Sequence, residues 1–141
     1  MSVSALHEML TQMSPHLAEE PYVMLSLPAE SVTEEHYHLA LATIKEREGI
    51  TLVIKERDAK QIKQASCELF RLITLEVNSD LMAVGLTAAF AQTLAAADIP
   101  CNVFAGYFHD HILVPDALAE SALTQLLQLA KTEIVPGQQE I

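Results

Sequence analysis

Apolar residues in the first half of the chain come in short runs that polar residues separate. The apolar positions over residues 4–13 recur at helical spacing and predict a short amphipathic helix, which Pro15 ends. The polar stretch Glu30–Glu35 predicts a loop, and Asp58 with Gln61 fits a capping box that starts a short helix. Three runs predict strands, the last two of them forming a hairpin: Tyr22–Pro28, His38–Lys45 and Ile50–Lys55.

The second half predicts a strand, a long helix, a second hairpin and a last helix. Alternating apolar residues mark the strand Leu69–Val77, and the polar residues that follow can cap the helix Leu81–Ala97. One stripe of this helix should cover the sheet, and the other needs a partner, within the chain or from another subunit. The two stripes are Met82, Leu86, Phe90 and Leu94, and Val84, Ala88, Ala91 and Ala95. The hairpin and the last helix are expected at Asn102–Phe108, at His111–Val114 and from Pro115 onward.

An internal repeat organises these elements. The hairpin and helix at Thr43–Ile62 recur in the same order at Val103–Ala122, 60 residues later. Few residues separate the first strand from its hairpin, and they are too few for a long crossover helix. The first unit is therefore expected to have a shortened crossover, and the second a full βαββα order. This order predicts an α+β fold of mixed sheets with helices on one face.

Composition excludes several classes of partner. The 141 residues suit one compact domain or two very small ones, and 50% of them are hydrophobic, so a core can form without disulfides or metals. The net charge of −11 disfavours nucleic acid and anionic membranes. The start of the chain lacks signal-peptide features and no stretch is apolar enough to span a membrane, which predicts a cytoplasmic protein. The two cysteines, Cys67 and Cys101, are expected to be buried free thiols.

Two segments carry a more specific signal. Glu76–Pro115 contains the phrases AVGLTAA, IPCNV and GYFHDHILVP, and Ile44–Ile54 reads IKEREGITLVI. The first segment resembles the ACT superfamily, and more closely small bacterial proteins of tandem ACT-like units, a family once classed as a domain of unknown function. The second segment matches the first unit of that family. The resemblance covers roughly Met9 to Ala130, and over GYFHDHILV the chain is also similar to ACT units of cytosolic amino-acid sensors and of aspartate kinases.

The resemblance implies a ferredoxin-like fold, a tandem repeat of two ACT-like βαβ units with antiparallel sheets that pair side by side. We expect an N-terminal unit at residues 1–67, a C-terminal unit at 68–134 and a flexible tail at 135–141. The resemblance also implies that a small molecule, often an amino acid, binds where two units meet. It further implies a homo-oligomer that regulates a separate enzyme or transporter, and it does not imply catalysis.

Seven residues are candidates for ligand binding within that resemblance. The loop before the long helix ends at a helix N-terminus, whose free N–H groups can hold a carboxylate, and Gly85 permits close approach. The alternative for this loop is a helix cap with a tight packing contact. Asp110, carried over from the similar sensor units, would pair with an amino or cationic group; the alternative is a solvated turn residue. The candidates are Asn78, Ser79, Val84, Gly85, Leu86, His109 and Asp110.

No catalytic, cofactor or metal site is expected. The pairs His36/His38 and His109/His111 would each present two imidazoles on one face of a strand, but no cysteine pair or HExxH spacing accompanies them. Surface histidines are therefore the preferred interpretation, and no nucleophile elbow, P-loop or GxGxxG pattern is present. The sequence predicts a non-catalytic module that senses a small molecule. The alternative is a ligand-free structural or oligomerisation module.

Overall fold

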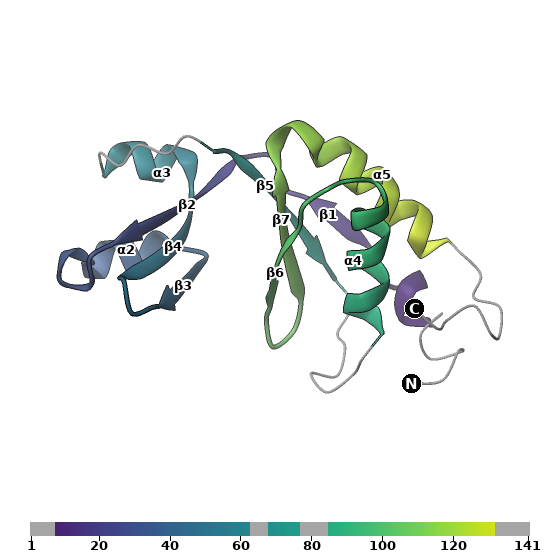
Figure 1. The fold of residues 1–141 in the computed structure, drawn as a ribbon, viewed down its shortest axis with the longest axis horizontal. Helices are drawn as coiled ribbons and strands as arrows, with labels where there is room; N and C mark the ends of the chain where they lie inside the picture. The colour runs from purple at the N-terminus through teal and green to yellow at the C-terminus, as the bar shows by residue number, and fades with distance from the viewer. Residues whose placement is uncertain (1–7, 63–67, 77–84, 132–141) are drawn as a thin grey trace. The chain divides into compact units, whose positions relative to one another are not determined.

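The computed structural model describes residues 8–62, 68–76 and 85–131, and the chain divides into two compact units (Figure 1). One unit is contiguous in sequence, Glu19–Arg71, and we call it the inserted unit. The other combines Met1–Ala18 with Leu72–Ile141, and we call it the split unit. The inserted unit therefore interrupts the sequence of the split unit.

The inserted unit is an antiparallel sheet with short helices against one face. Its strands are β2 (Tyr22–Leu27), β3 (Ala42–Lys45) and β4 (Ile50–Lys55), in the spatial order β3-β4-β2. Because side chains alternate along a strand, every second residue of β2 and β4 points to one face. The helices α2 (Glu34–Leu39) and α3 (Glu56–Gln61) contribute residues to the core on that face. This core contains Val23, Leu25, Leu27, Ile50, Leu52, Ile54 and Ala59.

The segment before β3 is helical, so the predicted loop at Glu30–Glu35 and the predicted strand start at His38 are wrong. A capping box starts α2: the His36 backbone N–H donates to Thr33 Oγ1 (3.3 Å), and the Thr33 backbone N–H donates to His36 Nδ1 (3.0 Å). Two glutamates in the first turn also favour the helix, because its N-terminus carries partial positive charge. The strand begins only at Ala42.

The shortened crossover of the first unit is confirmed. Between β2 and β3 the chain forms a 3-10 turn, η1 (Ala29–Ser31), and the six-residue α2. The expected capping box at Asp58 is wrong, because α3 follows β4 directly with Lys55 as its N-cap and already includes Asp58.

The split unit is a sheet accompanied by two longer helices. Its strands in spatial order are β1 (Pro15–Leu17), β5 (Phe70–Leu75, in this unit from Leu72 onward), β7 (Asp110–Pro115) and β6 (Asn102–Ala105). The helices are α4 (Leu86–Ala96) and α5 (Ala119–Ala130), the latter preceded by the 3-10 turn η2 (Asp116–Leu118). Residues from both helices and from β5 and β7 share one core, which contains Ile73, Leu75, Phe90, Leu94, Ile112, Val114, Ala122 and Leu126.

The N-terminal segment belongs to the split unit, and its strand β1 was not predicted. Residues 8–11 are helical, and Leu10 and Met13 are fully buried in the core of the split unit. Strand β1 then pairs antiparallel with β5, from Pro15 opposite Leu75 to Leu17 opposite Ile73. Grouping by contact therefore differs from the expected contiguous units at residues 1–67 and 68–134, because the first strand pairs with β5.

Helix α4 begins later than the periodicity predicts. It starts at Leu86 rather than Leu81, with Gly85 as its N-cap at φ 107°, a conformation that favours glycine. Leu86, Phe90 and Leu94 of the first predicted stripe are buried in the core, while Met82 and Val84 lie outside the described residues. In the second stripe, Ala91 packs partly against the core, and Ala88 and Ala95 are exposed. The described part of the chain therefore leaves much of the second stripe uncovered.

The 60-residue repeat is confirmed in both the bounds and the pairing of the hairpins. Each bound of β3 and β4, moved by 60 residues, gives the matching bound of β6 and β7. The pairing registers match as well: Thr43 lies opposite Leu52, and Val103 lies opposite Ile112. The turns close with equivalent backbone hydrogen bonds, Glu46 N to Gly49 O and Gly106 N to His109 O, both 2.8 Å. The α+β, ferredoxin-like fold of antiparallel hairpins and helices is thus the fold expected.

Candidate functional site

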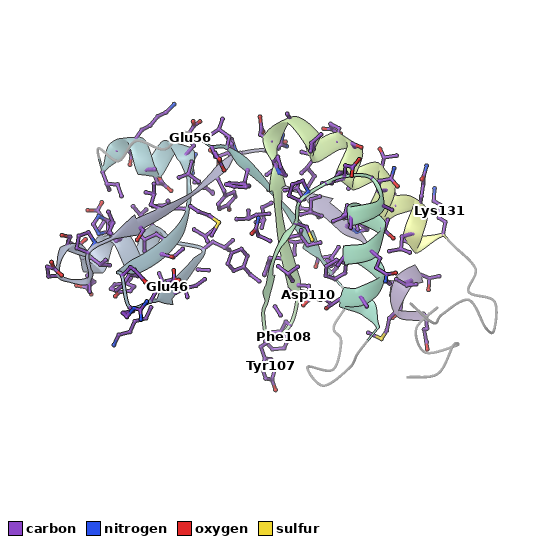
Figure 2. All side chains as sticks on the ribbon, viewed as in Figure 1. Glu46, Glu56, Tyr107, Phe108, Asp110 and Lys131 are labelled. Atoms are coloured by element: carbon purple, nitrogen blue, oxygen red, sulfur yellow. The ribbon has the colours of Figure 1, made fainter. Side chains whose placement is uncertain are left out.

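The turn between β6 and β7 brings three titratable residues into succession. Gly106 and His109 close this turn, and a Cβ atom at Gly106 would lie 2.9 Å from the His109 carbonyl oxygen, closer than side chains allow. Glycine therefore permits the tight approach that ends the turn at His109 and starts β7 at Asp110. His111 follows in the same strand. Figure 2 shows Asp110 along this hairpin, beyond the turn residues Tyr107 and Phe108.

Thr74 of the neighbouring strand β5, and Glu76 just after this strand, lie near the two histidines. Thr74 Oγ1 and His111 Nδ1 form a hydrogen bond of 3.0 Å, and Glu76 Oε2 lies 3.9 Å from His109 Nδ1. Glu76 follows the end of β5 and His109 precedes the start of β7, while Asp110, between the two histidines, interacts electrostatically with His111. We call Thr74, Glu76, His109, Asp110 and His111 the β5–β7 polar cluster.

Partial burial sets the electrostatics of this cluster. Burial raises the pKa of Asp110 above its ordinary value of 3.8, and the nearby His111 acts in the opposite direction. Burial also lowers the pKa of His111 below 6.5, with a further lowering by His109, while Asp110 and Glu76 act against it. His109 Nδ1 is buried and makes no hydrogen bond among the described residues. Burial therefore disfavours the charged forms of Asp110 and His111 more than their described neighbours favour them. Shifted pKa values of this kind are typical of binding sites.

The predicted candidates fall into three groups. Asn78, Ser79 and Val84 lie outside the described residues. Gly85 and Leu86 lie at the start of α4, where the Gly85 carbonyl accepts a hydrogen bond from Ala89 N at 2.8 Å. The Leu86 side chain is only 3% exposed and packs in the core, so it is not available as a side-chain contact for a ligand.

His109 and Asp110 are the candidates that the structure brings together with other polar side chains. Sequence reasoning missed Thr74 and Glu76 as their neighbours, and considered His111 beside His109 only as a pair of imidazoles for a metal. A signal was present, because Thr74 and Glu76 are polar residues at alternate positions of the predicted strand Leu69–Val77, which also contains Arg71. The identity of the strand that pairs with β5 is a tertiary property, and no local pattern contains it.

The histidine pairs form no metal centre among the described residues, where no group of three potential ligands is found. His36 and His38 lie on helix α2 and not on a strand, and His36 Nδ1 serves the capping box. Residues two apart on a helix point in different directions, which removes the geometric basis of a shared imidazole face. Within the described ranges, no helix has the length and apolar character needed to cross a membrane.

Comparison with known proteins places both halves of the chain in one family. A model of the ACT domain matches residues 2–71, and a second ACT domain model matches residues 69–128. No protein with a curated description matches the chain significantly.

Solved structures give the same fold. A Vibrio cholerae protein of unknown function, described as a possible transport protein, is 45% identical with a TM-score of 0.76, over 89% of this chain and 96% of that one. The regulatory subunit of aspartate kinase from Thermus flavus is 11% identical with a TM-score of 0.60, over 82% and 95%. An allosteric aspartate kinase from Clostridium acetobutylicum is 12% identical with a TM-score of 0.59, over 83% and 34%. At these low identities, the two kinase structures share the fold alone.

Proposed function

Because the chain belongs to the ACT domain family, with two such domains in tandem, we propose that it is a regulatory module that senses a small molecule. An amino acid is the ligand class that the candidate residues suit, since it offers a carboxylate and an ammonium group. The module acts on a separate enzyme or transporter and carries no catalytic centre of its own. It works in the cytoplasm as a homo-oligomer, with residues 1–67 and 68–134 as its tandem units.

The observation that carries this proposal is the β5–β7 polar cluster. Asp110 is a partly buried carboxylate, and burial raises its pKa because it disfavours the ionised form. A cationic group beside Asp110 would stabilise the ionised carboxylate. The ligand ammonium group binds Asp110, with His109 beside it. The ligand carboxylate binds backbone N–H groups among Asn78, Ser79, Val84, Gly85 and Leu86.

Calorimetric titration of the full chain with the twenty amino acids tests the proposal. A ligand that binds only the folded state also raises the melting temperature, so thermal shift serves as the first screen. Asp110→Asn should weaken the selected amino acid by about tenfold to a hundredfold, the loss expected for one charge-assisted hydrogen bond. The matched control is Asp98→Asn, which removes the same charge outside the cluster. If no amino acid binds at millimolar concentration, the sensing function is wrong in this form.

A ligand-free oligomerisation module is the second candidate, and one observation favours it. Ala88 and Ala95 leave an apolar stripe of α4 exposed in the described chain. Ala88→Glu should then change the sedimentation of the protein without changing its fold. An unchanged sedimentation coefficient would exclude this face as the contact between copies.

A further inference from the structure

The two hairpins of the repeat have matching backbones but different turn residues. The turn of the inserted unit carries Arg47 and Glu48, and the positions 60 residues later in the split unit carry Tyr107 and Phe108. Both turns close with the same backbone hydrogen bond between their first and fourth residues. The turn conformation therefore forms with charged residues at these positions and does not require aromatic ones.

Tyr107 and Phe108 are also mostly exposed in the described chain. Tyr107 is 74% exposed and Phe108 60%, at the end of the β6–β7 hairpin (Figure 2). Their rings contact each other edge to face, with centroids 4.9 Å apart and planes at 71°. Two adjacent exposed aromatic rings form an apolar surface that is not required for a turn in contact with water. Aromatic residues are enriched in protein interfaces. We call Tyr107 and Phe108 the aromatic tip.

The net charge of the unit that carries the aromatic tip indicates which partner the tip suits. The sequence of the split unit contains nine acidic side chains and one basic, Lys131, which gives a net charge of −8. The inserted unit contains ten acidic and seven basic side chains, a net charge of −3. Two of the acidic residues, Glu76 and Asp110, belong to the polar cluster beside the turn. The aromatic tip is therefore carried by the more acidic of the two units.

We propose that the aromatic tip is a docking surface for a cationic segment of another protein, one that carries arginine beside apolar side chains. Arginine stacks on aromatic faces and is attracted to them electrostatically. The acidic split unit attracts such a segment and opposes the approach of anionic membranes and of a second copy of the same tip. The docking surface and the proposed amino-acid site are adjacent, since the ring centroids of Phe108 and His109 lie 6.5 Å apart, but Tyr107 and Phe108 are not among the proposed amino-acid contacts.

The test exchanges the tip for the residues of the equivalent turn. The double variant Tyr107→Arg with Phe108→Glu leaves the net charge of the chain unchanged, so a loss of binding reports the aromatic contact. The probe is a short synthetic peptide that repeats arginine, leucine and serine, and binding is followed by calorimetry and by amide NMR shifts. The wild-type chain should bind this peptide with the largest shifts at residues 107 and 108. The double variant should fold as the wild type does and bind at least about tenfold more weakly.

Three controls decide between the alternatives. A peptide with glutamate in place of arginine should not bind, and raised salt should weaken the arginine peptide, because exposed charges are screened. The reverse exchange, Arg47→Tyr with Glu48→Phe in the double variant, puts the aromatic pair on the inserted unit and should restore little binding.

Three results would each overturn the docking surface. The first is equal peptide binding by wild type and double variant. The second is self-association that the double variant abolishes, which would make a second copy the occupant. The third is binding to phosphatidylcholine vesicles that depends on the tip, which would make a lipid surface the occupant. Amino-acid titration of Tyr107→Arg, which leaves the Phe108–His109 ring contact in place, separates this inference from the proposed function: peptide binding should weaken while amino-acid binding is unchanged.

Discussion

His111 links the protonation of the split unit to its stability. Burial, followed by the charge of His109, lowers the pKa of its imidazole in the folded state below the ordinary value of 6.5. The unfolded chain therefore takes up this proton at a higher pH than the folded chain does. The contribution of His111 to stability is complete above pH 6.5 and is lost as the pH falls through the unfolded pKa toward the folded one.

We expect His111→Asn to reduce the loss of stability between about pH 7 and pH 5. The asparagine amide can still hydrogen-bond Thr74, so the difference between wild type and variant should grow with acidity and not be constant. Urea unfolding at several pH values measures this difference. His38→Asn, at an exposed position of α2, is the matched control. Parallel pH profiles of wild type and His111→Asn would contradict the prediction.

Lowering the pH should affect the contribution of Asp110 to stability in the opposite direction to that of His111. Because burial raises its pKa above 3.8, its ionised form disfavours the folded state at neutral pH, and this effect is relieved as acid protonates the carboxylate. Asp110→Asn should therefore stabilise the protein at pH 7, by about 0.5 kcal/mol or less. Glu120→Gln is a suitable control, since Glu120 lies in the first turn of α5, where a negative charge is favourable. A clear destabilisation by Asp110→Asn would show that the carboxylate is structural.

At this scale the sequence predicted part of the candidate site. His109 and Asp110 were found because they lie in one recognisable phrase of sequence, and the tight turn at Gly106 explains why they follow each other so closely. Thr74 and Glu76 were not found, because their relation to the histidines depends on which strands become neighbours in the sheet. That relation is a matter of tertiary pairing, which a single sequence does not reveal.

At the scale of elements, periodicity predicted the long strands and both hairpins but not the shortest segments. Three residues of β1 are too few to show an alternation, and Ser14 before them adopts a φ of 41° that only the tertiary structure explains. The start of α2 was missed because His36 takes the place that glutamate or glutamine fills in the usual capping box. Hydrophobic pattern thus located elements with large buried faces, while elements held by pairing or capping escaped it.

The buried residues before β1 give a prediction for this element. Met13 is fully buried against the core of the split unit, so Met13→Ala should lower the free energy of unfolding by about 2–5 kcal/mol. Met24, in β2 of the inserted unit, is only partly buried, and Met24→Ala should cost clearly less. Urea unfolding of both variants gives the comparison. Equal losses would mean that the N-terminal segment contributes no more to its core than a partly exposed side chain does.

At the scale of the whole molecule, the split unit depends on two segments that are distant in sequence. Deleting residues 1–18 would remove β1, Leu10 and Met13, and would leave the β1-facing edge of β5 unpaired. Hydrogen exchange should then quicken in β5 and β7, while β2 and β4 of the inserted unit keep their protection. The untruncated chain is the reference for each amide. Equal acceleration in both units would show that the two units do not unfold separately.

The interruption of the split unit by the inserted unit has a consequence for biosynthesis. A ribosome that adds about 5–20 residues each second completes Glu19–Arg71 several seconds after β1 has been made and before most of the split unit exists. The inserted unit can therefore fold first, while Leu10 and Met13 still lack the strands and helices that bury them. During this interval the nascent chain carries an apolar segment, ahead of the inserted unit, whose core partners have not yet been made. The split unit can complete its core only after the segments on both sides of the inserted unit have been synthesised.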